Sequence, residues 1–212
     1  MHLRSLLPLL LGLTCLAWPA WLPRARGAAR PLPVLFHVAL ESGKAVAEPA
    51  FLAQQLERAN AIFAPLGVTL ACVGLRSAVR VPAAIVSREQ RDALGMLLQP
   101  RVLNVFVTGT LMDVDEPGRA RRGVHWRVRS EPRRHLVILS AKAGPHVLAH
   151  ELGHFFGNPA HSQTPGNLMS YTPTEALPWL DPAQIARVQA SAARMLAEGE
   201  LKSRGPGKCF DP

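Results

Sequence analysis

The apolar positions of this sequence follow two periods, one typical of strands and one typical of helices. Apolar runs of strand length occur at residues 34–40, 68–73, 102–107, 124–128 and 136–140. Helical spacing, with proline or glycine near the ends, predicts helices at about residues 50–64, 87–98, 144–157 and 181–197. Strands and helices alternate along the chain, so we expect one α/β domain with a mixed, mostly parallel sheet.

Short sequence signals indicate where the helices begin and end. Two capping boxes, each with a glutamine three residues after the capping side chain, predict helix starts. They are Ser87 with Gln90 and Asp181 with Gln184. Gly144 and Pro145 predict the start of the third helix, because proline is tolerated in the first turn. Gly157 predicts its end, since glycine readily adopts the positive φ found at many helix ends.

The first residues have the pattern of an export signal. A short basic start precedes a leucine-rich run at residues 6–17, and small residues follow. We expect residues 1–27 to be a signal peptide and residues 28–212 to form one domain. An uncleaved membrane anchor is the alternative, but the run lies between Pro8 and Pro19 and is too short to span a bilayer easily. The protein would then be secreted, to the extracellular space or the periplasm, without stable membrane insertion.

The cysteines agree with an oxidising compartment. Removal of the signal peptide would take away Cys15 and leave Cys72 and Cys209. An even pair in an exported protein usually forms a disulfide, so we expect these two to be bonded.

The stretch HELGHFFGNPAH, residues 150–161, carries the candidate chemistry. On a helix His150 and His154 lie one turn apart on one face, where two imidazoles can share a zinc ion. The chain then turns at a glycine, so His161 can return as a third ligand. Three protein ligands leave a fourth position open, which is typical of a catalytic zinc site, and Glu151 lies close enough to act as a general base.

The pattern H-E-x-x-H-x-x-G-x-x-H resembles the signature of the metzincin clan of zinc endopeptidases. The clan also has a methionine turn after the third histidine, and Met169 in NLMSYT, residues 167–172, is similar to it. The resemblance implies a metzincin-like catalytic domain with two helices before the active site and one after it. It also implies that Met169 forms a hydrophobic floor beneath the metal and is not a ligand.

The residues after the motif resemble more than one branch of the clan. Ser162 and the interval of eight residues from His161 to Met169 look like matrixins. Tyr171 is similar to the tyrosine of astacins and serralysins, which can touch the zinc, and the order of elements loosely resembles pappalysin-like secreted enzymes. A tyrosine there can also donate a hydrogen bond to a developing oxyanion, which makes Tyr171 a candidate catalytic residue. An ordinary, partly buried tyrosine is the alternative.

These observations favour a secreted zinc-dependent endopeptidase that hydrolyses peptide bonds with a zinc-activated water and Glu151 as general base. Its partners would be protein or peptide substrates, and we expect a monomer. Two other functions stay open: a zinc-containing binding or structural domain without useful peptidase activity, and a zinc hydrolase with a non-protein substrate. The intact Glu151 argues against the first of them.

Two charged stretches precede the motif. The acids Asp113, Asp115 and Glu116 lie in a polar loop, residues 108–123, where calcium could bind, although a solvated loop is the interpretation we favour. Residues 119–134 hold seven arginines and one acid, in a chain of net charge +9. The stretch is too short and too poor in aromatic residues to favour nucleic acid.

In the resembling clan, the strand at this place is a sheet edge with which the substrate pairs, so the arginines would favour acidic substrates. Alternatively, arginines on an edge strand simply discourage self-association.

Overall fold

A mixed six-stranded sheet forms the centre of the computed structural model, which describes residues 31–78, 80–205, 207 and 209–210. Its four parallel strands are, in spatial order, β3 (Leu70–Ala78), β1 (Leu32–Glu41), β5 (Leu103–Thr108) and β8 (Glu131–Ser140). Two strands are antiparallel to their neighbours: β2 (Lys44–Ala45) beside β1 and β7 (Gly123–Val128) beside β8. The expected mixed, mostly parallel sheet is confirmed, and β7 forms one of its edges.

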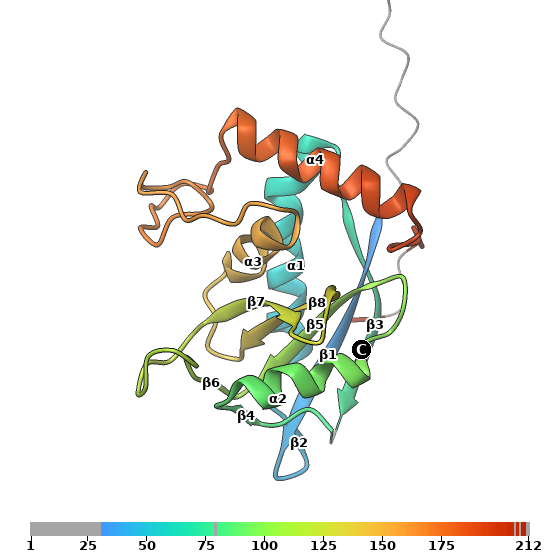
Figure 1. Cartoon of the computed structure of the whole chain (residues 1–212), viewed down its shortest axis with the longest axis vertical. Helices are drawn as coiled ribbons and strands as arrows, with labels where there is room; N and C mark the ends of the chain where they lie inside the picture. Colours follow the sequence, from blue (N-terminus) through green and yellow to red (C-terminus); the bar gives the residue numbers. More distant parts are fainter. Residues whose placement is uncertain (1–30, 79, 206, 208, 211–212) are drawn as a thin grey trace, which may run out of the picture.

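Helices lie on both faces of the sheet (Figure 1). They are α1 (Pro49–Phe63), α2 (Arg88–Ala93), α3 (Val147–Phe155) and α4 (Pro182–Ala197), with 3-10 turns η1 (Ala64–Leu66) after α1 and η2 (Leu94–Leu97) after α2. In Figure 1, α1 and α3 lie together on one side, α4 lies across the upper end of α1, and α2 lies on the other side. Two helices precede α3 and one follows it, as expected.

Alternating side chains of the central strands divide the core into two clusters. In β5, Val105 and Val107 pack with α1 and α3, whereas Phe106 between them packs with η2 on the opposite face. Strand β8 repeats the pattern with Val137 on the first face and Ile138 on the second. None of these side chains is more than 1% exposed. Burial on both faces explains why these strands are continuous apolar runs in the sequence.

Both capping boxes are confirmed. The backbone N–H of Gln90 donates to Ser87 Oγ over 3.3 Å, and that of Gln184 donates to Asp181 Oδ1 over 2.8 Å. Gly157, with a φ of 94°, follows the end of α3 as expected.

The predicted start of α3 at Gly144 and Pro145 is wrong, because the helix begins at Val147. A side chain from α1 forms hydrogen bonds with the first turn of α3 and with the segment before it. The Gln55 side chain accepts a hydrogen bond from the Leu148 N–H over 3.0 Å and donates one to the Gly144 carbonyl over 2.8 Å. Gln55 is fully buried, so α1 sets where the third helix starts.

The polar loop expected at residues 108–123 is partly ordered into a strand. Thr110–Leu111 forms β6, which pairs in parallel with β4 (Ala84–Ile85) in a second, two-stranded sheet. Strands this short could not be predicted, since two residues show no period.

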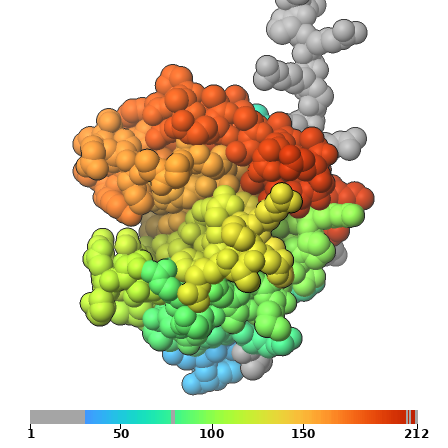
Figure 2. Space-filling view, viewed as in Figure 1, coloured from blue at the N-terminus to red at the C-terminus, as the bar shows by residue number. Residues whose placement is uncertain are grey.

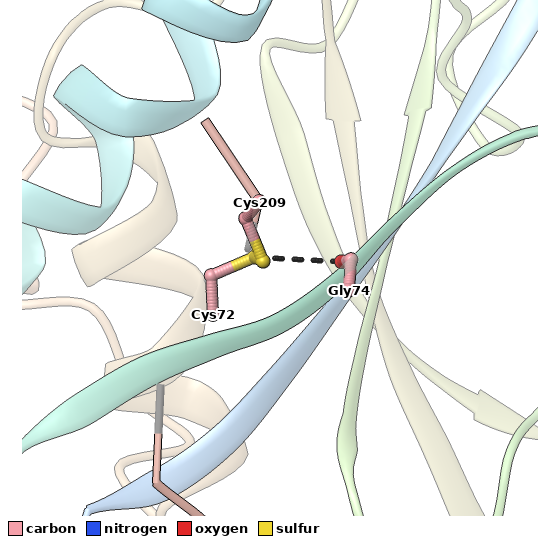
Figure 3. Close-up of a disulfide and its surroundings, with 3 residues drawn as sticks. All are labelled: Cys72, Gly74 and Cys209. Atoms are coloured by element: carbon pink, nitrogen blue, oxygen red, sulfur yellow. Dashed lines mark hydrogen bonds between the residues drawn. A yellow bond between two sulfur atoms is a disulfide. The ribbon is translucent and has the colours of Figure 1, made fainter. Parts of the chain in front are cut away.

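A disulfide joins Cys72 in β3 to Cys209 in the C-terminal tail (Figure 3). The Cα atoms are 6.1 Å apart, and Cys72 Sγ lies 3.4 Å from the Gly74 carbonyl oxygen. The neighbouring Gly207 N–H donates to the Cys72 carbonyl over 2.7 Å. The expected bridge is therefore present, and it ties the tail to the strand next to β1.

The predicted signal peptide, residues 1–27, lies outside the described residues. Where the chain is described, none of its helices is both long and apolar enough to cross a lipid bilayer.

Candidate metal centre

Three histidines from two segments converge at one point. His150 and His154 lie one turn apart on α3 with ring centroids 4.9 Å apart, and His161 comes from the segment after the helix. One potential ligand atom from each of the three lies within 4.8 Å of the others. The shortest separation joins His154 Nε2 to His161 Nε2, at 3.2 Å.

Backbone carbonyls orient two of the rings. His150 Nδ1 lies 2.7 Å from the Leu168 oxygen, and His154 Nδ1 lies 2.7 Å from the Asn158 oxygen. A carbonyl oxygen only accepts hydrogen bonds, so Nδ1 carries the proton in both rings and Nε2 keeps its lone pair. Such a set of imidazole nitrogens fits Zn²⁺ and leaves a fourth position for water.

Burial favours the uncharged form of all three rings, which is the form that binds metals. Burial lowers the pKa of His150 to about 4. Burial also lowers the pKa of His154 and of His161 below the ordinary histidine value. Protons therefore compete little with a metal ion at neutral pH.

Glu151 lies beside this cluster on α3 and is almost completely buried, at 6% exposed. Burial raises the pKa of its carboxyl to about 8, while a hydrogen bond from the backbone N–H of His125 and the charges of Arg121 and Arg91 act in the opposite direction. A divalent cation held by the three histidines would also lower the pKa of Glu151 and so favour its carboxylate form. A carboxyl group under these opposing influences suits a role in which it takes up and releases a proton near neutral pH.

Gly123, at the start of β7, lets the strand approach Glu151 closely. A Cβ atom at this position would lie 2.8 Å from Glu151 Oε1 and equally close to Glu151 Cγ, and nearer still to a methyl group of Val147. A side chain there would have to displace the carboxylate. The sequence offered only a weak signal for this role, a glycine at the start of a predicted strand.

Met169 and Tyr171 occupy different positions relative to the histidines. Met169 is fully buried, and its sulfur packs so close to Gly153 of α3 that a Cβ there would overlap it. Tyr171 is 62% exposed, which contradicts the partly buried alternative. Its ring lies 4.2 Å from that of His161 and 5.9 Å from that of His150, between centroids.

A cleft of about 770 Å³ contains these residues. It lies between β7 with its preceding segment on one side and α3 with the segment after it on the other. Figure 2 shows the surface hollowed between the yellow-green and the orange atoms at the left of the view. All five predicted site residues line it: His150, Glu151, His154, His161 and Tyr171. Five arginines also line it: Arg91, Arg119, Arg121, Arg122 and Arg127.

The interpretation of the acidic cluster as a solvated loop is wrong for Asp113, which is 7% exposed. Its carboxylate accepts hydrogen bonds from the N–H groups of Asp115 and Glu116 and from Arg121 Nε, the last over 2.5 Å. The Asp115 N–H is the main reason that the pKa of Asp113 falls to about 2. Asp115 pairs with Arg88 and Glu116 with Arg119.

These acids therefore neutralise arginines, and within the described part of the chain they do not gather into a group able to hold a metal ion such as calcium.

A chain of polar side chains leads away from the cleft, and its middle member, His135, is buried. His125, which lines the cleft, has Nε2 3.0 Å from Nδ1 of His135, and His135 Nε2 lies 2.9 Å from Glu200 Oε1. Burial is the main cause of a His125 pKa of about 3, so this ring adds no charge to the cleft. No local pattern in the sequence predicts this arrangement, because Glu200 is 65 positions from His135.

No protein-family model matches the sequence, and no curated protein matches it either. Several solved structures, however, are similar to this chain in fold. Metalloproteinase-II from Bacteroides fragilis is similar with a TM-score of 0.52 and 15% identity, over 78% of this chain and 55% of that one. Mature mirolysin from Tannerella forsythia, in complex with a cleaved peptide, gives a TM-score of 0.57 and 12% identity, over 84% and 99%. Archaemetzincin from Methanopyrus kandleri gives a TM-score of 0.50 and 17% identity, over 80% and 98%.

At these identities the likeness shows the fold, a mixed α/β fold similar to that of metzincin-like metalloproteases. The chain spans about half the length of the Bacteroides fragilis structure and nearly the full length of the other two.

Proposed function

We propose that this chain is a zinc-dependent endopeptidase. The observation that carries the proposal is the convergence of three uncharged imidazoles beside a buried carboxylate in one cleft. One fold neighbour is a metalloproteinase by name and another is in complex with a cleaved peptide, and both support a peptide as substrate. His150, His154 and His161 would hold the metal.

Each group of the cleft has a task in this reaction. A bound Zn²⁺ would polarise the carbonyl of the cleaved bond and lower the pKa of a water molecule. Glu151 accepts the proton of the attacking water and returns it to the leaving amine. The His125 N–H holds the carboxylate in place during both transfers. The exposed Tyr171 hydroxyl donates a hydrogen bond to the oxygen on which negative charge develops.

The proposal also includes export. The buried disulfide between Cys72 and Cys209 supports an oxidising compartment, extracellular or periplasmic. It agrees with the leucine-rich signal at residues 6–17. Ser162 and Tyr171 resemble different branches of the metzincin clan. We therefore propose the zinc-peptidase chemistry that the clan shares, and a matrixin-like or pappalysin-like enzyme stays a hypothesis.

Hydrolysis of casein by the purified chain, with and without a zinc chelator, tests the proposal. We expect cleavage that the chelator stops and that added Zn²⁺ restores. Zinc binding without cleavage would favour a binding domain instead. Hydrolysis of esters or amides other than peptides, with casein left intact, would favour a hydrolase of another class.

Replacing His161 with alanine should weaken zinc binding by more than about a hundredfold, because even outer partners of metal ligands contribute ten- to a hundredfold. The measurement is zinc retained against a competing chelator. His146→Ala is a matched control, since His146 precedes α3 and lies outside the cluster. Unchanged zinc retention in His161→Ala would remove His161 from the ligand set.

Replacing Gly123 with alanine should lower peptidase activity about tenfold while zinc content stays normal, because the added methyl group displaces the Glu151 carboxylate. Gly144→Ala serves as the control, since a Cβ there meets no atom within 4 Å. Equal activities of the two variants would show that the close approach of β7 is not needed.

A further inference from the structure

We propose that the cleft selects peptides with an acidic residue on each side of the cleaved bond, and that Arg122 and Arg127 make this selection. The inference rests on the proposed peptidase function and names its substrate class. It follows from which arginines of residues 119–134 lack a carboxylate partner, from where these arginines lie along β7, and from the partners of the acids that line the cleft.

The structure divides the arginines of this stretch by their partners. Four of them pair with acids of the chain: Arg119 with Glu116, Arg121 with Asp113, Arg129 with Asp92 and Glu89, and Arg134 with Glu131. Arg133 lines a separate, smaller cavity. Arg122 and Arg127 line the cleft, and their hydrogen bonds go only to backbone carbonyls, of Lys142 and Pro132 respectively. Across the described residues, these two have no carboxylate partner, so their charge is available to a ligand.

Arg122 directly precedes β7 and Arg127 is the second-last residue of this strand, with Glu151 beside the residues between them. Gly123 contacts Glu151 and Val147 in the first part of α3. Further along β7, His125 packs against Phe155 at the end of the same helix. Strand and helix therefore run in the same direction, and Glu151 lies beside residues between Arg122 and Arg127. At about 3.3 Å per strand residue, the two arginines are separated by roughly 16 Å of strand.

Strand β7 pairs only with β8 among the described strands, so its other edge faces the cleft. An extended peptide can add to such an edge, with main-chain hydrogen bonds holding it and side chains giving specificity. A peptide placed in this way would bring residues about four to six positions apart to the two arginines, one on each side of the cleaved bond.

The described acids that line the cleft already have partners. Asp113 and Asp115 pair with Arg121 and Arg88, and Glu151 accepts a hydrogen bond from the His125 N–H. An acidic side chain would thus find two unpaired guanidinium groups, which suit carboxylates by their planar, forked geometry.

The experiment measures both cleavage and binding with four peptides of ten residues that share one central sequence. They carry glutamate on both sides, on the first side only, on the second side only, or glutamine at both positions. Cleavage is measured with the zinc-loaded protein at about 20 mM and about 500 mM salt. Binding is measured by fluorescence anisotropy with the zinc-loaded Glu151→Gln variant, which does not depend on turnover.

We expect each glutamate to improve binding and kcat/KM about threefold to fivefold at low salt, as for exposed ion pairs, and high salt to reduce the effect. Arg122→Gln should abolish the preference on one side only, and Arg127→Gln on the other side only. Arg129→Gln is the matched control, because Arg129 lies outside the cleft and pairs with Asp92; it should keep both preferences.

Equal binding and equal cleavage of all four peptides would overturn the inference, as would a preference that survives both substitutions. If the acidic peptides bind more tightly but no peptide is cleaved, the proposed peptidase function fails while the acidic selectivity of the cleft stands.

Discussion

Glu151→Gln should lower kcat of peptide hydrolysis by about a hundredfold to ten-thousandfold while leaving zinc binding intact, which is the range for removal of a general base. Glutamine has the same shape and keeps an oxygen that accepts the His125 N–H, but it takes up no proton at neutral pH. Neither the histidine cluster nor the packing of α3 should change. Metal analysis together with steady-state kinetics on one peptide measures the effect.

The matched control is Glu89→Gln, an exposed glutamate near the start of α2 that pairs with Arg129. It should retain full activity, because Glu89 does not line the cleft. A Glu151→Gln protein that turns over peptide at nearly the normal rate would show that another group, or water alone, accepts the proton.

Removal of the disulfide, whose two cysteines belong to the hydrophobic core, should destabilise the fold strongly. The bridge spans 137 residues, and the chain-entropy estimate for a loop of that length is about 5 kcal/mol. The Cys72→Ala/Cys209→Ala protein should therefore lose up to this much of its free energy of unfolding. Urea unfolding of the oxidised parent and of the double variant gives the difference directly.

Reduced parent protein provides a second comparison, since it keeps both cysteines and lacks only the bond. It should unfold at nearly the same urea concentration as the double variant. A loss below about 1 kcal/mol, or two reactive thiols in the denatured, unreduced parent, would mean that the bridge does not hold the tail in solution.

Features that depend on near neighbours in the chain could be predicted from the sequence. The spacing of His150 and His154 needs only a helix, and the capping boxes at Ser87 and Asp181 join residues three apart. Apolar runs identified the parallel strands because these strands are buried on both faces. The disulfide was predictable because only two cysteines follow the predicted signal peptide, so the pairing had no alternative.

Features that depend on contacts between distant residues could not be predicted. Gln55 is buried in α1, but nothing in the sequence pattern indicates that it binds the first turn of α3, 93 residues away. The role of Gly123 depends on a backbone approach that no local pattern records. The acidic loop was misjudged because Asp113 is buried by an arginine eight residues further on, and composition alone makes such a loop look solvated.

The hydrogen bond between Gln55 and α3 also has a consequence for how the candidate metal site forms during folding. Helix α3 has nine residues, fewer than the roughly 12–15 that an isolated helix needs to be even marginally stable in water. Its first turn gains Gln55 as a hydrogen-bond partner only once α1 has docked. We therefore expect His150 and His154 to reach their relative positions only together with the packing of α1. Metal capture should then be an all-or-none property of the assembled domain, with little affinity in a nascent or partly unfolded chain.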